Sequence, residues 1–244
     1  NATIFPHNIG LGCTFDKRIV KKVADITARE VSATGIDWNF APCLSIPQDE
    51  RWGRFYEGYS KDPEIVAELG AATINGYQGK LGKKYSIAAC AKHFIGDGAT
   101  VWGTGDNNYQ IDRGNAISSK EELYNKYLIP YQEAINNNVL TVMASFNSYN
   151  GLKCHASNYL FNDLLKDELG FEGFVISDWR GIDEIPGDYK SDIITSVNAG
   201  IDMIMVPGDT IWGGEPYHKF LKLFKKAVNE GSITEERLDD AVRR

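Results

Sequence analysis

The sequence lacks several features that would assign it to a class at once. No segment approaches the roughly 20 consecutive apolar residues that a membrane helix needs. There is no long basic run, and the net charge of -7 argues against a nucleic-acid partner. No Gly-rich dinucleotide fingerprint follows the first apolar run, which disfavours a Rossmann fold. Without a low-complexity segment or a linker, the chain is expected to form one domain.

Cysteine is scarce, and its spacing carries no metal motif. The four cysteines are Cys13, Cys43, Cys90 and Cys154, with no Cys-x-x-Cys pair among them. This spacing does not indicate a zinc site, and no metal cluster is visible in the sequence. Cys90 lies in an apolar run and is expected to be a small buried residue. The cysteines leave both the disulfide state and the cellular compartment open.

The 244 residues that are present alternate between short apolar runs and longer amphipathic stretches. The runs at 3–5, 37–41, 87–91, 140–145, 174–177 and 202–206 are predicted strands. Helices are predicted at 16–35, 62–79, 118–138, 156–170, 189–200, 215–230 and 233–244. This repeat is typical of βαβ units and a parallel sheet. Six strands are two short of a closed (β/α)8 barrel, so we expect an α/β TIM-type barrel that is incomplete at its ends.

Local signals support several of these helices. Asp16 and Asp62 are candidate N-caps, and Pro63 occupies a favourable first helical position. Gly35 is the expected stop of the first long helix. Pro130 should bend the helix predicted over 118–138, because its ring interrupts the hydrogen-bond ladder.

Polar side chains follow the predicted strands, at the end where parallel barrels carry their active sites. Lys92 and His93 follow one strand, and "SDWR" at 177–180 follows another. A long loop after 37–41 contains "ERWGRFYEGY". Aromatic faces and charged planar groups together suit a sugar, since they stack on rings and bind hydroxyls. In this interpretation Asp178 is a nucleophile and Trp179 is a wall of its pocket.

Each of these residues also has a plainer interpretation. Asp178 could be the N-cap of the next segment, and His93 could be a structural histidine. Arg54 could pair with Glu57 on an exposed turn. Lys92 could form a Schiff base, as in aldolase-type barrels, and Met143 could belong to the core.

Three motifs carry a specific resemblance. "ERWGRFYEGYSKDP", "AKHFIGDG" and "GFEGFVISDWRGID" resemble the N-terminal barrel domain of glycoside hydrolase family 3, over nearly all of residues 1–244. The β-glucosidases and plant-type exo-β-glucanases of that family are the most similar. The resemblance implies that Asp178 is the catalytic nucleophile. It implies substrate contacts for Arg54, Lys92, His93, Asp106, Met143 and Trp179. Phe146 stands where plant-type members carry a Tyr.

The resemblance further implies retaining hydrolysis of β-glucosides or β-glucan oligosaccharides from the non-reducing end, without a metal or organic cofactor. In the glucosidase branch the acid/base Glu comes from a second domain, which we expect to be absent from residues 1–244, together with a sugar-binding Asp before residue 1. Glu215 is an internal candidate acid. Asp97 replaces the histidine of the N-acetylglucosaminidase branch, which favours a glucosidase. Family members are often secreted or periplasmic.

Three hypotheses therefore stand: a retaining β-glucosidase or exo-β-glucanase domain, a sugar-binding or inactive barrel fragment, and a Lys92 lyase. For the first two the expected partners are the sugar and the second domain of the same protein, with no nucleic acid and no membrane.

Overall fold

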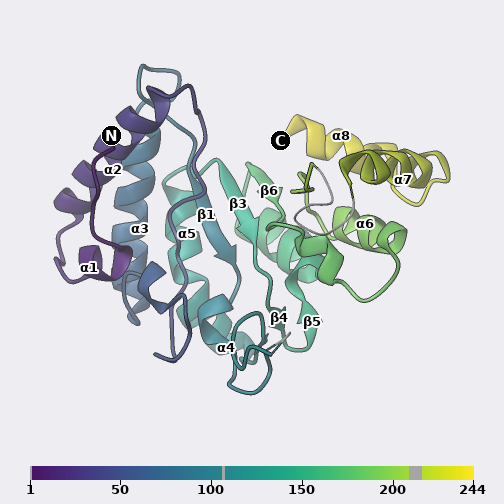
Figure 1. Cartoon of the computed structure of the whole chain (residues 1–244), viewed down its shortest axis with the longest axis horizontal. Helices are drawn as coiled ribbons and strands as arrows, with labels where there is room; N and C mark the ends of the chain where they lie inside the picture. Colours follow the sequence, from purple (N-terminus) through teal and green to yellow (C-terminus); the bar gives the residue numbers. More distant parts are fainter. Residues whose placement is uncertain (1, 106–107, 209–215) are drawn as a thin grey trace. The chain divides into compact units, whose positions relative to one another are not determined.

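The structure is a computed structural model that describes residues 2–105, 108–208 and 216–244 (Figure 1). The chain forms two compact units. The first is Asn1–Val142 with Asn147–Gly151, and the second is Met143–Phe146 with Leu152–Arg244. The boundary passes through strand β3, Thr141–Ala144. Each unit combines helices with strands, which confirms the predicted α/β class.

The first unit begins with three helices: α1 Asn8–Gly12, α2 Lys17–Ser32 and α3 Pro63–Gln78. The Asp16 side chain accepts a hydrogen bond from the Arg18 N–H and so begins α2. Asp62 begins α3 in the same way, with Pro63 in the first turn, where a missing N–H costs nothing. Both predicted helix starts are confirmed.

Helices α2 and α3 lie side by side (Figure 1). Their backbones approach closely at Gly76, where a Cβ would lie 2.4 Å from the Ala24 Cβ. Near the end of α3, the buried Gln78 side chain accepts hydrogen bonds from the N–H groups of Ala89 and Leu140. Ala89 and Leu140 each directly precede a strand, β1 and β3. The buried Gln78 side chain therefore connects the starts of both strands.

Strand β1, Cys90–Phe94, belongs to the first unit and is a hydrogen-bonded neighbour of β3. Parallel bridges Trp38–Ala88 and Cys43–Lys92 place residues 38–43 alongside it. A shorter parallel pair joins β2, Asn115–Ala116, to β4, Ser148–Tyr149. The parallel sense agrees with the βαβ pattern of the sequence.

The helix predicted over 118–138 is divided into three segments: α4 Lys120–Glu122, the π-helical η3 Leu123–Tyr127 and α5 Ile129–Asn136. Pro130 lies in the first turn of α5, directly after the interruption at Leu128. The helix that Pro130 was predicted to bend is thus interrupted next to that residue. Two 3₁₀ turns, η1 Phe55–Glu57 and η2 Asp97–Ala99, complete the first unit.

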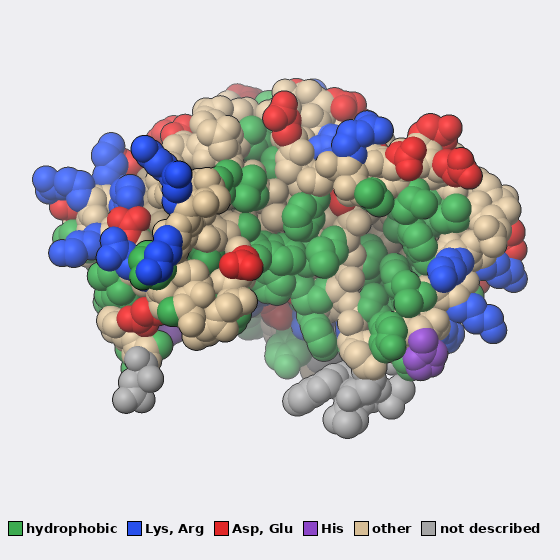
Figure 2. All heavy atoms as spheres, turned by 90° about the horizontal axis from the view of Figure 1, so that it is seen from above, with side chains coloured by type: hydrophobic (Ala, Val, Ile, Leu, Met, Phe, Trp, Pro, Cys, Tyr) green, Lys and Arg blue, Asp and Glu red, His purple; other side chains and the backbone are tan. Residues whose placement is uncertain are grey.

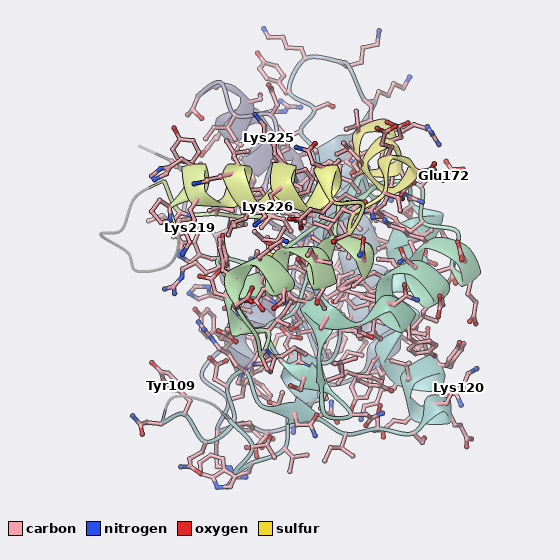
Figure 3. All side chains as sticks on the ribbon, turned by 90° about the vertical axis from the view of Figure 1, so that its right-hand side faces the viewer. Tyr109, Lys120, Glu172, Lys219, Lys225 and Lys226 are labelled. Carbon is pink, nitrogen blue, oxygen red and sulfur yellow. The ribbon has the colours of Figure 1, made fainter. Side chains whose placement is uncertain are left out.

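The second unit contains β5 Leu152–Lys153, β6 Phe174–Ile176, the short turns η4 Cys154–Ala156 and η6 Gly181–Glu184, the π-helical η5 Tyr159–Glu168, α6 Tyr189–Asn198, α7 Tyr217–Asn229 and α8 Glu235–Arg243. Apolar residues recur along α7 at Phe220, Phe224 and Ala227, and they pack on α6 at Ile193 and Val197. Figure 3 shows Lys219, Lys225 and Lys226 on the same helix α7, and these three residues are exposed.

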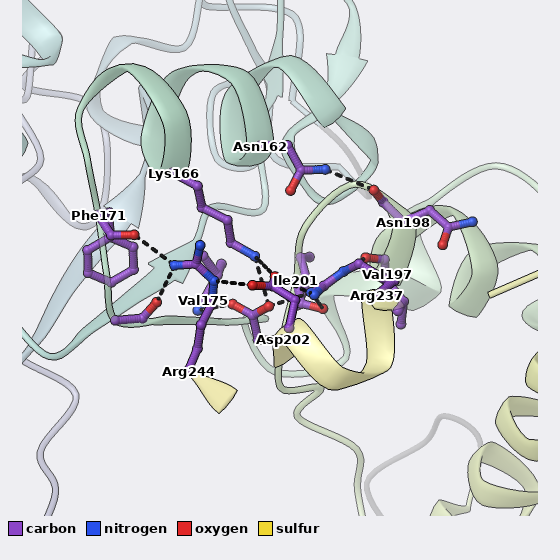
Figure 4. Close-up of polar contacts among 12 residues, drawn as sticks. Asn162, Lys166, Phe171, Val175, Val197, Asn198, Ile201, Asp202, Arg237 and Arg244 are labelled. Atoms are coloured by element: carbon purple, nitrogen blue, oxygen red, sulfur yellow. Dashed lines mark hydrogen bonds and ion pairs between the residues drawn. The ribbon is translucent and has the colours of Figure 1, made fainter. Parts of the chain in front are cut away.

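A buried ionic cluster lies beside the start of β6 (Figure 4). The Asp202 carboxylate contacts the Lys166 ammonium at 2.8 Å and the Arg237 guanidinium. It also accepts a hydrogen bond of 2.8 Å from the Val175 N–H. Arg244 donates to the carbonyls of Phe171 and Gly173. These contacts attach α8 to the strand and to η5.

Several predicted strands are wrong in extent. Residues 3–5 form no strand, because Thr3 donates its N–H and its hydroxyl to Glu30 instead of to a strand. The stretches 37–41 and 202–206 are reduced to single bridges at Trp38 and Met203, and the strand predicted at 87–91 is Cys90–Phe94. The strands of the described residues form small sheets and no closed barrel. No helix in that part of the chain has both the length and the apolar character needed to cross a bilayer.

Candidate active site

Arg54 is held by two acceptors in the first unit. Its Nε and Nη2 each donate to the Glu57 carboxylate at 2.8 Å. The same Nη2 lies 2.9 Å from His93 Nε2. Burial raises the pKa of Glu57, but the paired Arg54 lowers it further, and the net pKa is below the usual range. The pair predicted from the sequence is present, but it is partly buried and extends to His93.

His93 lies on β1, and both of its ring nitrogens have partners. Nδ1 is 2.7 Å from Asp97 Oδ2, and Asp97 also accepts from the Ser45 hydroxyl at 2.6 Å and from the Gly98 N–H. A guanidinium can only donate, so the Arg54 contact requires Nε2 without a proton and places the ring proton on Nδ1. His93 is therefore a satisfied histidine, and it also connects Asp97 to Arg54.

Burial and hydrogen bonding shift the pKa values of His93 and Asp97 in opposite directions. Burial disfavours the imidazolium, but the hydrogen bond to Asp97 outweighs it and raises the pKa of His93. The pKa of Asp97 is lowered by His93 and Ser45 against the effect of its burial. A second proton would stand on Nε2, facing the Arg54 donor at 2.9 Å. Protonation of His93 at Nε2 and the present Arg54 contact therefore exclude each other.

Lys92 precedes His93 on β1 and is half-buried. Its backbone bridges to the 42–44 segment, where its carbonyl accepts from the Leu44 N–H and its N–H donates to the Pro42 carbonyl.

Asp178 stands directly after β6 in the second unit, half-buried. Its carboxylate accepts from the Trp179 N–H at 2.6 Å, and its own N–H donates to His155 Nε2 at 3.1 Å. The next helical turn, η6, begins after Arg180 without a side-chain cap. The N-cap interpretation of Asp178 is therefore wrong, and its backbone position is set by His155.

The other candidate residues of the second unit differ in exposure. Trp179 is 44% exposed, whereas Met143 is buried, as its core interpretation predicted. Phe146 is tilted against the His155 ring at 6.1 Å between centroids. The Ser177 hydroxyl donates to the Asp178 carbonyl and accepts from the Met205 N–H, so the tip of β6 is held from two sides.

Two residues that contact the candidate site residues could not be identified from the sequence, and two that the sequence named lie outside the described residues. His155 is 23 residues before Asp178 and follows a turn, so no local pattern connects the two. Ser45 is likewise distant from Asp97 along the chain. Asp106 and Glu215, both named from the sequence, lie outside the described residues.

A hollow on the first unit is lined by none of the candidate site residues discussed above. It measures ≈180 Å³ and lies at the ends of α2 and α3, at the start of the segment that leads into β1. Arg29, Lys80, Lys83 and Lys84 are among its lining residues. Figure 2 looks onto this end and shows basic side chains gathered there. The candidate residues Lys92 and His93 lie further along β1, so we do not assign this hollow to them.

Comparison with known proteins assigns the family. Residues 1–244 match the glycosyl hydrolase family 3 N terminal domain. The chain belongs to this family.

Named relatives and solved structures agree with that assignment. A lysosomal beta glucosidase of Dictyostelium discoideum is 33% identical, over 100% of this chain and 29% of its own length. A periplasmic beta-glucosidase of Salmonella typhimurium is 30% identical, over 99% of this chain and 30% of its own length. The exo-1,3/1,4-beta-glucanase ExoP of a Pseudoalteromonas species, as its Q683A mutant, has a TM-score of 0.90 and 43% identity, over 100% of this chain and 38% of that chain. The chain thus spans under two fifths of each of these proteins.

Proposed function

We propose that this chain is the nucleophile-bearing part of a retaining β-glucosidase or exo-β-glucanase. One observation carries the proposal: Asp178 stands at the tip of β6, with its backbone held by His155 and its carboxylate by the Trp179 N–H, in a chain of glycosyl hydrolase family 3. Relatives named as beta-glucosidases support the activity. Solved Listeria innocua relatives in complex with glucose and laminaribiose support a sugar substrate.

The proposed reaction has two displacements. In the first, an Asp178 oxygen bonds to the anomeric carbon while the glycosidic C–O bond breaks, and the leaving oxygen takes a proton from a second carboxyl group. In the second, that group removes a proton from water, water oxygen bonds to the anomeric carbon, and the Asp178–sugar bond breaks. We propose that the acid/base Glu comes from a second domain, because the relatives are about three times as long as this chain.

Substrate contacts are proposed for the remaining candidates. Arg54, Lys92 and His93 would bind sugar hydroxyls. The Arg54 guanidinium is already oriented and donates in a fixed plane, and His93 Nε2 would accept from a hydroxyl in place of Arg54. The exposed Trp179 would stack on a ring, and Met143 and Asp106 are proposed as further sugar contacts by resemblance. An incomplete (β/α)8 barrel is also proposed for this chain, and the parallel bridges beside β1 and β6 support it. A secreted or periplasmic location is proposed from the name of the Salmonella relative.

The test is covalent labelling. The chain is incubated with an activated 2-deoxy-2-fluoro-β-glucoside, and intact mass and peptide mapping follow. Because an activated leaving group needs little help from an acid, the label should form on Asp178 in this chain alone. Asp178→Asn should abolish it, and Asp167→Asn, an exposed carboxylate of the same unit, should not. A folded chain that takes no label, or takes it elsewhere, would favour the sugar-binding or inactive fragment.

A further inference from the structure

A thiol, an imidazole and a carboxylate lie together in the first unit, next to the Arg54–Glu57 pair. They belong to Cys43, His93 and Asp97, which we call the thiol–imidazole cluster. One ligand atom from each lies within 4.8 Å of the other two. The three residues are 4%, 3% and 8% exposed. They come from separate segments: the bridge beside β1, β1 itself and η2.

The members of this cluster are connected by hydrogen bonds. The Cys43 thiol donates to the Ser45 hydroxyl at 3.1 Å, and that hydroxyl donates to Asp97 Oδ2 at 2.6 Å. His93 Nδ1 reaches the same Oδ2 at 2.7 Å. One carboxylate oxygen is thus the acceptor for two donors, and the thiol proton points toward it through Ser45. A divalent cation could replace these protons, because it binds the same atoms after deprotonation.

We propose that the thiol–imidazole cluster is a binding site for a thiophilic divalent cation of the Zn²⁺ class. Sulfur, nitrogen and oxygen ligands of this kind bind Zn²⁺ at about 2.0–2.3 Å, in a tetrahedron with one position open to water. The ligand atoms must therefore move closer together by side-chain rotation. A small cavity of ≈10 Å³, lined by Ser45 and Asp97, has room for about one water beside the cluster.

The choice of metal follows from the ligands. A thiolate and an imidazole favour Zn²⁺ and Co²⁺ over Mg²⁺ and Ca²⁺, which prefer oxygen ligands alone. The thiolate and the carboxylate together balance the two charges of the cation. Burial of a neutral assembly avoids the desolvation cost of an unpaired ion.

Metal binding would also change the neighbouring Arg54 contact. A cation on His93 Nδ1 leaves the ring proton on Nε2, the atom that now accepts from Arg54 Nη2. Two donors would then face each other, so Arg54 must turn away. The cation and the present Arg54–His93 contact are mutually exclusive. This inference does not depend on glucoside hydrolysis.

Cobalt spectroscopy tests the site. The whole 244-residue chain is titrated with Co²⁺ under reducing, anaerobic conditions. We expect one bound Co²⁺ per chain, a sulfur-to-cobalt charge-transfer band and the intense visible bands of tetrahedral cobalt, all displaced by Zn²⁺. Mg²⁺ should displace nothing.

Two cysteine variants locate the ligand. Cys43→Ser keeps a hydroxyl donor for Ser45 but removes the thiolate, so the charge-transfer band should disappear and the affinity should fall about tenfold or more. Cys13→Ala, which removes an exposed free thiol, should leave both unchanged. A wild-type chain without the band overturns the proposal whether or not the variants fold. Loss of the charge-transfer band in Cys13→Ala would also overturn it.

Discussion

Gly181 limits which side chains the loop after β6 can accept. A Cβ at this position would lie 2.2 Å from His155 Nε2, the atom that accepts from the Asp178 N–H. His155 is buried at 1% exposure and cannot move aside freely. The shape of the loop that presents Asp178 therefore depends on a glycine three residues away.

Gly181→Ala should displace either the loop or the His155 ring. We expect the variant to lose about 1–3 kcal/mol of unfolding free energy, the usual cost of forcing atoms into a packed site. It should also label more slowly at Asp178 with the activated fluoroglucoside. Urea titration and time-resolved mass spectrometry measure the two effects. Gly208→Ala, where a Cβ meets no atom of the described residues within 4 Å, is the matched control and should change neither.

At this scale the sequence could name candidate residues but not their contacts. Asp178, Lys92 and His93 could be named because they follow apolar runs at strand ends. His155, the partner of Asp178, could not, because it lies 23 residues away along the chain, and neither could Ser45, which lies 52 residues from its partner Asp97. Only the folded chain defines such pairs.

Helix α6 carries a buried acid in its first turn. Asp192 is 4% exposed, and burial together with the nearby charge of Asp188 raises its pKa to about 6. The folded form therefore binds a proton more tightly than the unfolded form. The stability that this proton contributes is fully present below about pH 4, and it is lost as the pH rises through about 6.

Asp192→Asn should therefore stabilise the chain only where the wild-type carboxylate is charged. We expect a gain of order 1 kcal/mol at pH 7.5 and none at pH 4, since an amide is neutral at both. Thermal melts at the two pH values give the comparison. An equal gain at both would show that packing and not charge is responsible. Asp167→Asn, on the exposed side of η5, should show no such pH dependence.

Elements with local signals were the easiest to predict. The caps at Asp16 and Asp62 depend on neighbouring residues, and the structure confirms them. The helix predicted around Pro130 is interrupted next to that residue. Strand limits depend on partners far away in sequence. The stretch 202–206 looks like a strand by composition, yet it keeps one bridge, at Met203, and the Val175 N–H of β6 donates to the Asp202 side chain instead of to a backbone carbonyl.

At the scale of the whole molecule, the ionic cluster attaches the helix α8 to residues far from it along the chain. Arg237 on α8 contacts Asp202, and it also donates to the carbonyls of Val197 and Ile201. Burial lowers the pKa of Lys166, and Asp202 opposes this effect. Removal of one cation leaves a buried carboxylate incompletely paired.

Arg237→Met should therefore cost about 3 kcal/mol or more of unfolding free energy, although methionine keeps most of the apolar stem. Arg243→Met, six residues along the same helix, removes an exposed guanidinium and should change stability by less than about 0.5 kcal/mol. Chemical denaturation of both variants tests the difference. Equal effects would mean that helix propensity, and not the cluster, sets the contribution of α8.

The Arg54 guanidinium has a thermodynamic consequence beyond its contacts. Glu57 and His93 immobilise it in the folded chain, before any ligand arrives. An arginine that is ordered only on binding loses about 2 kcal/mol of rotamer entropy at that moment. Here the loss accompanies folding. A hydroxyl that binds this group should therefore show, in calorimetry, an enthalpy of hydrogen bonding with little opposing side-chain entropy.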